Sequence, residues 1–345
     1  MITAAGIEAG SISHLAETIA TGTGEVTAAE AIALMSVMPG SPEAAAVLAG
    51  AGLIRQRRCG DRLQVCAIVN AKAGNCSEDC TYCAQSHRSE SGPASSPWME
   101  PDALGAAAAR ARAAGAHALG LVAAWRGIGS GPVLEHVCAS VRDLAQTGGV
   151  RVDVSLGLIR DPVVARRLRE SGAAVYHHNL ETAPSFFPAT CTTHTFADRL
   201  RTLDIARAAG LRLCCGGIVG LGESLAQRVE LAFALRLVDP DTVPLNVLDP
   251  LPGTRLETRP RLNPDEFLLT LAMFRYVLPN QILLAAGGKE AVLGGRLHEI
   301  LATGINAVMV GDYLTSPGTG LEYWRHQAAR HGLRLDPVTS AGAMG

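Results

Sequence analysis

The feature that most restricts the fold is a repeated alternation of short apolar runs with longer helical segments. The apolar runs lie at residues 63–70, 118–124, 151–156, 174–179, 211–220, 242–248, 281–286 and 305–311. Each is followed by a helical pattern, most of them rich in alanine, arginine and leucine. Strands that alternate with helices form parallel sheets, so eight such units predict an α/β fold, a (β/α)8 barrel of the TIM type. A doubly wound open sheet is the alternative, but no G-x-G-x-x-G sequence follows the first run.

The chain ahead of the first apolar run is predicted to be helical. The segments "TAAEAIALM" and "SPEAAAVLAGAGLIRQRR" are rich in alanine and begin at a threonine and a serine, which cap helix N-termini. We therefore expect an N-terminal helical extension (residues 1–60), a β/α barrel (61–335) and a frayed tail (336–345).

Composition argues against several classes of protein. The formal net charge is -2 and aromatic residues make up 4% of the chain, so neither a basic field nor stacking side chains favour nucleic-acid binding. No apolar run approaches the roughly 18 residues that span a membrane. The N-terminus lacks the basic and apolar regions of a signal peptide. We expect a soluble, cytoplasmic protein.

Three of the nine cysteines lie within eight residues. The sequence "NCSEDCTYCAQS" places Cys76, Cys80 and Cys83 in a C-x3-C-x2-C pattern, in the loop after the first predicted strand. In β/α barrels the loops at this end of the strands carry the chemistry. Structural zinc needs four closed ligands, and no second cysteine pair follows. A [4Fe–4S] cluster on three thiolates keeps one iron open, as catalysis requires.

This spacing, with Tyr82 ahead of the last cysteine, resembles the radical S-adenosylmethionine (SAM) superfamily. The stretches "CSEDCTYCAQS", "YHHNLETAPSFFP", "CTTHTFADRLRTLDIARAAGL", "GGIVGLGES" and "VPLNVLDPLPGTRL" together resemble the biotin synthase family over nearly the whole chain. The resemblance implies a radical SAM sulfurtransferase that makes biotin from dethiobiotin. It implies a catalytic [4Fe–4S] cluster on Cys76, Cys80 and Cys83, bound SAM, and an auxiliary iron–sulfur cluster that donates sulfur. It also implies a reducing electron donor, such as a flavodoxin or ferredoxin, and a homodimer.

The resemblance assigns six further residues to the cofactor and the substrate. They are Tyr82 and Ile218 against the adenine of SAM, Asn179 and Glu181 at its ribose and methionine parts, Arg199 at its carboxylate, and Asn246 at the ureido ring of dethiobiotin. Each has a structural alternative, such as loop packing for Tyr82, a surface charge for Arg199 and a strand cap for Asn246.

The chain departs from the family pattern at the auxiliary cluster. The four positions that usually hold a [2Fe–2S] cluster, with three cysteines and an arginine, are occupied by Gly120, Asp153, Cys214 and Leu284. Some members of the family resemble this chain and hold a different, cysteine-rich cluster. We predict that Cys66, Cys191 and Cys214 line one cavity, with Cys59 arriving from just before the first strand, and that these four hold an auxiliary cluster. Packing as small buried hydrophobes is the alternative.

Alternation along strands predicts where neighbouring side chains point. Cys214 is expected to face the barrel interior and Cys215 the helices, while Cys138 packs within its helix. His177 shares a face with Asn179 and looks into the barrel, where it either contacts substrate or a cluster or packs in the core; His178 is expected to point outward.

Two other functions stay open at this point. One is a biotin-synthase-like radical SAM enzyme that acts on another small substrate without sulfur insertion, which a second cluster would argue against. The other is a non-enzymatic cluster scaffold, which SAM binding would argue against.

Overall fold

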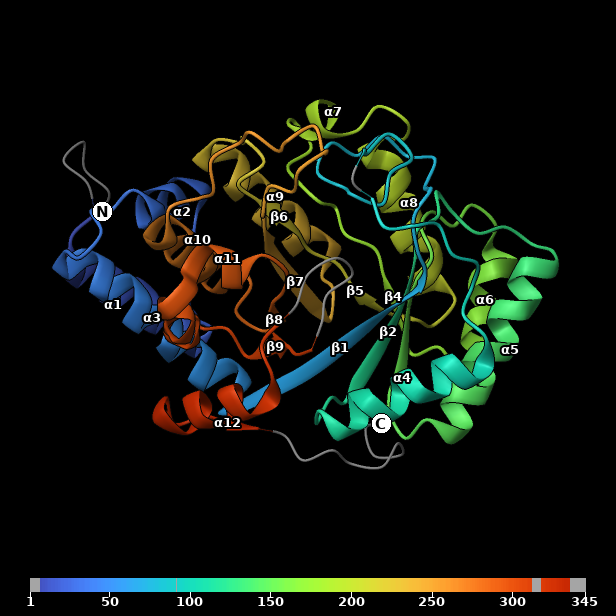
Figure 1. Cartoon of the computed structure of the whole chain (residues 1–345). Coiled ribbons are helices and arrows are strands. Elements are labelled where there is room, and N and C mark those ends of the chain that lie inside the picture. The colour runs from blue at the N-terminus through green and yellow to red at the C-terminus, as the bar shows by residue number, and fades with distance from the viewer. Residues whose placement is uncertain (1–6, 91, 312–317, 336–345) are drawn as a thin grey trace.

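A closed barrel of eight parallel strands forms the centre of the computed structural model, which describes residues 7–90, 92–311 and 318–335 (Figure 1). Around the barrel the strand order is β1-β2-β3-β4-β5-β7-β8-β9, and β9 pairs back with β1. The strands are β1 (Arg62–Lys72), β2 (Ala118–Ala123), β3 (Arg151–Ser155), β4 (Val175–His177), β5 (Arg212–Cys214), β6 (Gly217–Val219), β7 (Thr242–Val247), β8 (Ile282–Ala285), β9 (Ala307–Met309) and β10 (Arg334–Leu335). The predicted (β/α)8 barrel is therefore confirmed.

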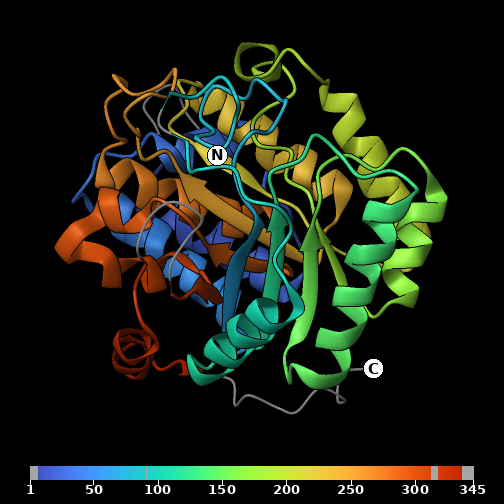
Figure 2. The same ribbon diagram turned by 45° about the vertical axis from the view of Figure 1, so that its right-hand side comes forward.

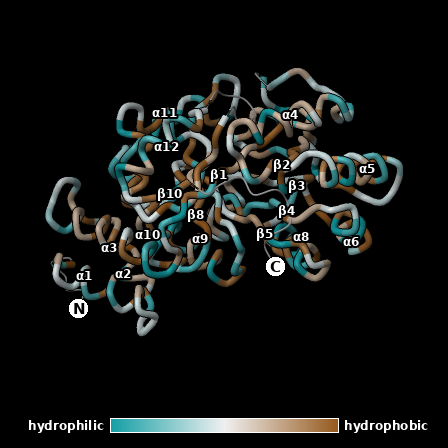
Figure 3. The backbone as a smooth tube through the Cα atoms, turned by 90° about the horizontal axis from the view of Figure 1, so that it is seen from below, coloured by the Kyte–Doolittle hydropathy of each residue, from teal (hydrophilic) through white to brown (hydrophobic). Residues whose placement is uncertain are grey.

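Helices surround the strands, as the view along the barrel shows (Figure 3). They are α1 (Ala9–Thr21), α2 (Ala28–Met35), α3 (Pro42–Cys59), α4 (Pro101–Ala113), α5 (Pro132–Thr147), α6 (Pro162–Glu170), α7 (Phe187–Thr190), α8 (Phe196–Ala208), α9 (Leu225–Val238), α10 (Pro264–Val277), α11 (Lys289–Leu293), the 3-10 helix η1 (Gly294–Thr303) and α12 (Leu321–Arg330). Among the described residues, no helix is both long and apolar enough to cross a lipid bilayer.

Two strands differ from the prediction. The fifth apolar run forms both β5 and β6, and each pairs with β7. The break coincides with Pro244 on β7, which has no N–H to donate to the ladder. Gly216 lies so close to it that a Cβ there would be 1.9 Å from the Pro244 carbonyl oxygen. The short β10 was not predicted and pairs with the start of β1.

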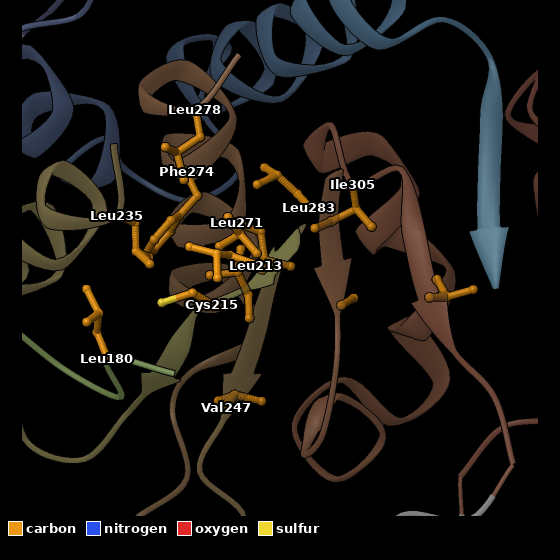
Figure 4. Packing of buried hydrophobic residues seen from close by; sticks show 14 of the residues in the cluster. Leu180, Leu213, Cys215, Leu235, Val247, Leu271, Phe274, Leu278, Leu283 and Ile305 are labelled. Carbon is orange, nitrogen blue, oxygen red and sulfur yellow. The ribbon is translucent and has the colours of Figure 1, made fainter. Parts of the chain in front are cut away.

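The main hydrophobic core lies between the strands and the helices. Figure 4 shows Cys215 packed among Leu213, Leu271 and Phe274. The Cys215 side chain is fully buried, so its predicted orientation toward the helices is confirmed. Cys138 on α5 is also buried in this core, as predicted. Each large side chain buried here stabilises the fold by about 1.5–3 kcal/mol.

The N-terminal helices lie beside α10, on the side of the barrel away from α4, α5 and α6 (Figures 1 and 2). The helix α2 begins at a capping box in which Thr27 and Glu30 satisfy each other's backbone N–H groups. The helix α3 begins at Ser41, whose hydroxyl accepts from the Ala44 N–H. The division at residue 60 stays a prediction, and the predicted tail at 336–345 lies outside the described residues.

The barrel interior has an apolar side and a polar side. Leu284, Ala286, Ala307 and Met309 form a small separate cluster on β8, β9 and the turn after β8. Polar side chains instead occupy β3, β4 and β5, opposite that cluster. This asymmetry places Arg151, Asp153, His177 and Cys214 on one wall of the barrel.

Candidate functional site

A cavity of about 400 Å³ opens at the carboxyl ends of the strands. Its walls come from the loops after β1, β2, β3, β4, β7 and β8, where barrel enzymes place their chemistry. All the predicted contacts to SAM and substrate line it, together with the motif cysteines: Cys76, Cys80, Tyr82, Cys83, Asn179, Glu181, Arg199, Ile218 and Asn246. The fold therefore gathers in one place residues that are spread over 170 positions of the sequence.

The cysteine loop is closed by its own backbone. It starts at Gly74 and Asn75, which both adopt left-handed conformations (φ 63° and 56°) that glycine and asparagine tolerate best. The Cys76 N–H donates to the Gln85 carbonyl at 2.9 Å, and the His87 N–H donates to the Cys76 carbonyl at 2.8 Å. These bonds fix the loop before any metal binds.

The three motif thiols lie in a partly buried setting. Burial raises the pKa of Cys83 to about 11 and raises the pKa of Cys76. Iron binds cysteine as thiolate, so a metal at this loop has to displace these protons.

The wall formed after β4 is a chain of hydrogen bonds. The ring Nε2 of His177 lies 3.0 Å from Asn179 Oδ1, which also accepts from the Gly216 N–H at 3.0 Å. Asn179 Nδ2 donates to Glu181 Oε2 at 3.4 Å. His177 therefore faces the barrel, as predicted. Glu181 has φ 71°, a conformation rarely adopted by a residue with a side chain and one that often marks a functional site.

Arg199 reaches this wall from α8. Its Nη1 donates to the Asn179 carbonyl at 2.8 Å and lies 3.5 Å from Glu181 Oε1, and its guanidinium stacks over Phe187. The side chain is 7% exposed, so the alternative of a surface charge is wrong.

Three nitrogen atoms on the cavity wall have no hydrogen-bond partner among the described residues. They are Arg199 Nε, His194 Nε2 and His178 Nε2. His178 was predicted to point outward, and this is wrong because β4 ends at His177 and the strand alternation stops there. Buried donors without partners are costly, so a bound polar or anionic group is expected to satisfy them.

Asn246 lies on β7, beside Ile218 of β6. Its Nδ2 donates to the Gly217 carbonyl at 3.2 Å, and its Oδ1 accepts from the Gly287 N–H at 2.9 Å. A carboxamide has one further N–H and one further lone pair. Asn246 is thus held by the backbone and still has one donor and one acceptor for a ligand.

Four residues lie beneath the cavity, inside the barrel: Cys66, Arg151, Asp153 and Cys214, here called the lower barrel group. Arg151 makes a two-bonded ion pair with Asp153, at 2.9 and 2.7 Å. Burial lowers the pKa of Arg151, but Asp153 and, to a smaller extent, both cysteines raise it above its usual value. Burial raises the pKa of Cys66 to about 11. Cys214 lies inside the barrel, as predicted.

Cys59 and Cys191 do not join this group, so the prediction that Cys191 lines one cavity with Cys66 and Cys214, and that Cys59 reaches it from before the first strand, is wrong. Cys59 ends α3 at the amino ends of the strands, where its sulfur accepts from Arg275 Nη1 at 3.3 Å. Cys191 follows α7 on the opposite side of the barrel and lies 3.3 Å from Asp79 Oδ1. The helix and loop that carry these two cysteines hold them at the two ends of the barrel.

The polar groups behind the cysteine loop were not predicted from the sequence. Glu78 Oε2 accepts from His194 Nδ1 at 2.6 Å, and Glu78 Oε1 lies 3.1 Å from Arg126 Nε. Asp79 Oδ1 accepts from the backbone N–H groups of Thr192 and Thr193. The available signal was the acidic pair inside the cysteine motif, since such a pair next to metal ligands needs partners.

Comparison with known proteins places the chain in a family. Residues 72–235 match the radical SAM superfamily, and residues 244–334 match the biotin and thiamin synthesis associated domain. The chain is 42% identical to a biotin synthase of Geotalea uraniireducens, over 79% of this chain and 82% of that protein. It is 41% identical to a biotin synthase of Geobacter metallireducens, over 87% of this chain and 90% of that protein.

Solved structures share the fold at low identity. A methylornithine synthase has a TM-score of 0.79 at 17% identity, covering 94% of this chain and 98% of that one. A maturase of the [FeFe]-hydrogenase has a TM-score of 0.79 at 16% identity, covering 95% of this chain and 76% of that one. These likenesses bear on the fold alone. From the identity and coverage of the curated relatives, the chain belongs to the biotin synthase family of the radical SAM superfamily.

Proposed function

We propose that this protein converts dethiobiotin to biotin by radical sulfur insertion. The observation that carries the proposal is the single cavity, which joins the three-cysteine loop to a wall of polar residues and to an apolar pocket. Family membership supports the reaction class, and the residues that line the cavity support the roles proposed for them.

The residues present fit a [4Fe–4S] cluster and SAM. Cys76, Cys80 and Cys83 would hold three irons and leave the fourth open. When bound, the cluster supplies the electron that cleaves SAM to a 5′-deoxyadenosyl radical. The partnerless nitrogens of Arg199 and His194 suit the carboxylate of a bound amino acid moiety, because charge-assisted hydrogen bonds to a carboxylate are the strong ones.

The other predicted contacts divide the cavity between SAM and substrate. Asn179 and Glu181, held as described, would orient the ribose and methionine parts of SAM, and Tyr82 and Ile218 would lie against adenine. Asn246 would use its remaining donor and acceptor on the ureido ring of dethiobiotin. A ureido group offers both an N–H and a C=O, so the match is chemical.

The remaining walls exclude water from the reacting atoms. Val122, Ala123, Leu158, Ala286 and Met309 give the cavity apolar surface for the alkyl chain of dethiobiotin. A carbon radical requires a site without solvent groups that would quench it. The residues of this protein would thus bind and orient SAM and dethiobiotin and keep water away from the reacting atoms.

We also propose that the lower barrel group holds the auxiliary cluster that supplies sulfur. Cys66 and Cys214 would offer two sulfur ligands and Asp153 a carboxylate oxygen. Gly120 and Leu284, at two of the usual family positions, have no ligand atoms. Cys59 and Cys191 are left out of this set because of where they lie.

Three further statements rest on the family likeness alone. The reductant would be a flavodoxin or ferredoxin, the assembly a homodimer, and the location the cytoplasm.

The test is turnover of anaerobically reconstituted protein with SAM, a reductant and dethiobiotin, followed by mass spectrometry of the products. Formation of both biotin and 5′-deoxyadenosine is expected. Formation of 5′-deoxyadenosine without biotin, at saturating sulfide and iron, would contradict sulfur insertion and favour a radical SAM reaction on another small substrate.

A further inference from the structure

Glu78 is the second residue after Cys76 in the cysteine loop, and its buried carboxylate lies between two other side chains of the cavity wall. Glu78 Oε2 lies 2.6 Å from His194 Nδ1, and Glu78 Oε1 lies 3.1 Å from Arg126 Nε. All three residues line the cavity, and His194 is only 7% exposed. One carboxylate therefore holds an imidazole ring and a guanidinium side by side on this wall.

Thr193 joins these residues into a closed group, here called the Glu78 brace (Glu78, Arg126, Thr193 and His194). Arg126 Nη2 donates to the Thr193 carbonyl at 2.9 Å, and the Thr193 hydroxyl donates to Glu78 Oε2. Thr193 Oγ1 also accepts from the Asp79 N–H at 3.2 Å, which ties it to the cysteine loop. The brace thus fixes segments after β1, β2 and α7 relative to one another.

The brace determines which nitrogen atoms are left to bind a ligand. Because an ionised carboxylate only accepts, His194 Nδ1 carries the hydrogen of its contact with Glu78. His194 Nε2 is buried and has no hydrogen-bond partner among the residues that the structure describes. In Arg126, Nε and Nη2 are engaged by Glu78 and Thr193, which leaves Nη1. These two nitrogen atoms suit a ligand that carries a carboxylate.

The place of the brace favours the amino acid moiety of SAM as that ligand. Glu78 lies between Cys76 and Cys80, so the brace adjoins the loop that is proposed to hold the cluster. The sulfonium of SAM has to lie close to the cluster that reduces it, and it carries the amino acid moiety on a short carbon chain. The ureido ring of dethiobiotin is assigned instead to Asn246 on β7.

We propose that Glu78 is a positioning residue for SAM, which holds Arg126 and His194 so that Arg126 Nη1 and His194 Nε2 bind its amino acid moiety. The inference deepens the proposed function and rests on it, in that SAM binds in this cavity. Fixing the amino acid end of SAM orients the sulfonium toward the cluster, and orientation of the reacting groups lowers the barrier to reaction.

Two competing interpretations make different predictions. The ligand atoms of Glu78, Cys191 and His194 lie within 4.8 Å of one another, as in a site for a single metal ion. Hydrogen bonds already engage these groups, and the Cys191 sulfur lies 3.3 Å from Asp79 Oδ1. The other interpretation is that the brace only holds the loops together. Metal content and the affinity for a truncated ligand distinguish the three.

The experiment compares SAM with 5′-methylthioadenosine, which has the adenine, ribose and sulfur of SAM but no amino acid moiety. Isothermal titration calorimetry on the full chain, anaerobically reconstituted with iron and sulfide, measures both dissociation constants. Glu78→Gln keeps the shape of the side chain and removes its charge. In this variant the dissociation constant of SAM is expected to rise by about 10-fold, while that of 5′-methylthioadenosine stays at the wild-type value.

A second variant and a control sharpen the comparison. Arg126 is 47% exposed, so Arg126→Gln is compatible with the fold, and it is expected to weaken SAM but not 5′-methylthioadenosine. In Glu78→Gln/Arg126→Gln the loss for SAM should be smaller than the product of the two single losses, because Glu78 acts through Arg126. Asp249→Asn is the matched control, since its carboxylate also lines the cavity and accepts from Arg261 at 2.8 Å. It should keep the wild-type ratio of the two constants.

Three results would overturn the inference. Equal weakening of both ligands in Glu78→Gln means that the brace only holds the loops together, and an unchanged affinity for SAM means that it does not act on SAM. Loss of iron or of another metal in Glu78→Gln, measured by elemental analysis, means that Glu78 is a metal ligand. A wild type that does not bind SAM contradicts the proposed function as well, and so is told apart from failure of this inference alone. If circular dichroism shows that Glu78→Gln is unfolded, Arg126→Gln decides between the interpretations.

Discussion

The cysteine loop and the lower barrel group place thiols in opposite surroundings. The loop carries Cys76, Cys80 and Cys83 on irregular backbone at the mouth of the cavity. Nitrogen atoms of Arg199 and His194 on the cavity wall have no hydrogen-bond partner among the described residues. The lower group carries Cys66 and Cys214 on regular strands beneath it, next to an ion pair. Loop geometry leaves room for an exchangeable ligand such as SAM, while strands hold a group fixed. The difference suggests one site for repeated turnover and one for a resident cluster.

Removing the two thiols of the lower barrel group is expected to have the largest effect on activity. In Cys66→Ala/Cys214→Ala, biotin formation is expected to be abolished while 5′-deoxyadenosine formation continues, because the loop site is untouched. Product analysis by mass spectrometry checks both. If biotin forms at the wild-type rate, the lower barrel group is not the sulfur source. Cys138→Ala serves as the control for general loss of a buried cysteine.

Changing Arg199 in the cavity should have the next largest effect. Arg199→Lys keeps the charge but loses the planar fork, so the dissociation constant of SAM is expected to rise by about 10-fold, a cost of about 1.4 kcal/mol. Isothermal titration calorimetry on reconstituted protein measures it. The iron content should not change, and an unaltered affinity would remove Arg199 from the SAM site.

Cys59 should give the smallest effect, since it belongs to neither site. Its sulfur accepts from Arg275 Nη1, which also donates to the carbonyls of Leu278 and Pro279. In Cys59→Ala the free energy of unfolding is expected to fall by about 1 kcal/mol, with iron content unchanged. Denaturant unfolding and iron analysis measure the two. A drop in iron would return Cys59 to the auxiliary cluster.

Periodicity and short motifs were enough to predict the barrel and nine of the residues that line its cavity. The strands repeat a strong local pattern, and Asn179, Glu181 and Arg199 occur within motifs whose order is retained along the chain. Side-chain direction also followed from strand alternation at Cys214 and Cys215, but failed at His178, just past the end of β4.

The grouping of the remaining cysteines was not predictable from the sequence. Cys59 and Cys191 lie in a helix end and a loop, where no periodic rule relates a side chain to the barrel axis. Their partners, Arg275 and Asp79, are more than 100 residues away in the chain, so only the folded structure brings them together. The same holds for the pairing of Glu78 with His194.

The most direct test of two separate sites is the iron and sulfide content, with Mössbauer spectra, of anaerobically reconstituted wild type and of the Cys76/Cys80/Cys83→Ala variant. We expect the variant to lose the loop cluster and to retain iron with the spectrum of a second cluster. A variant without iron would mean that the protein holds one cluster only, and would contradict both the resident cluster of the lower barrel group and its role as sulfur source.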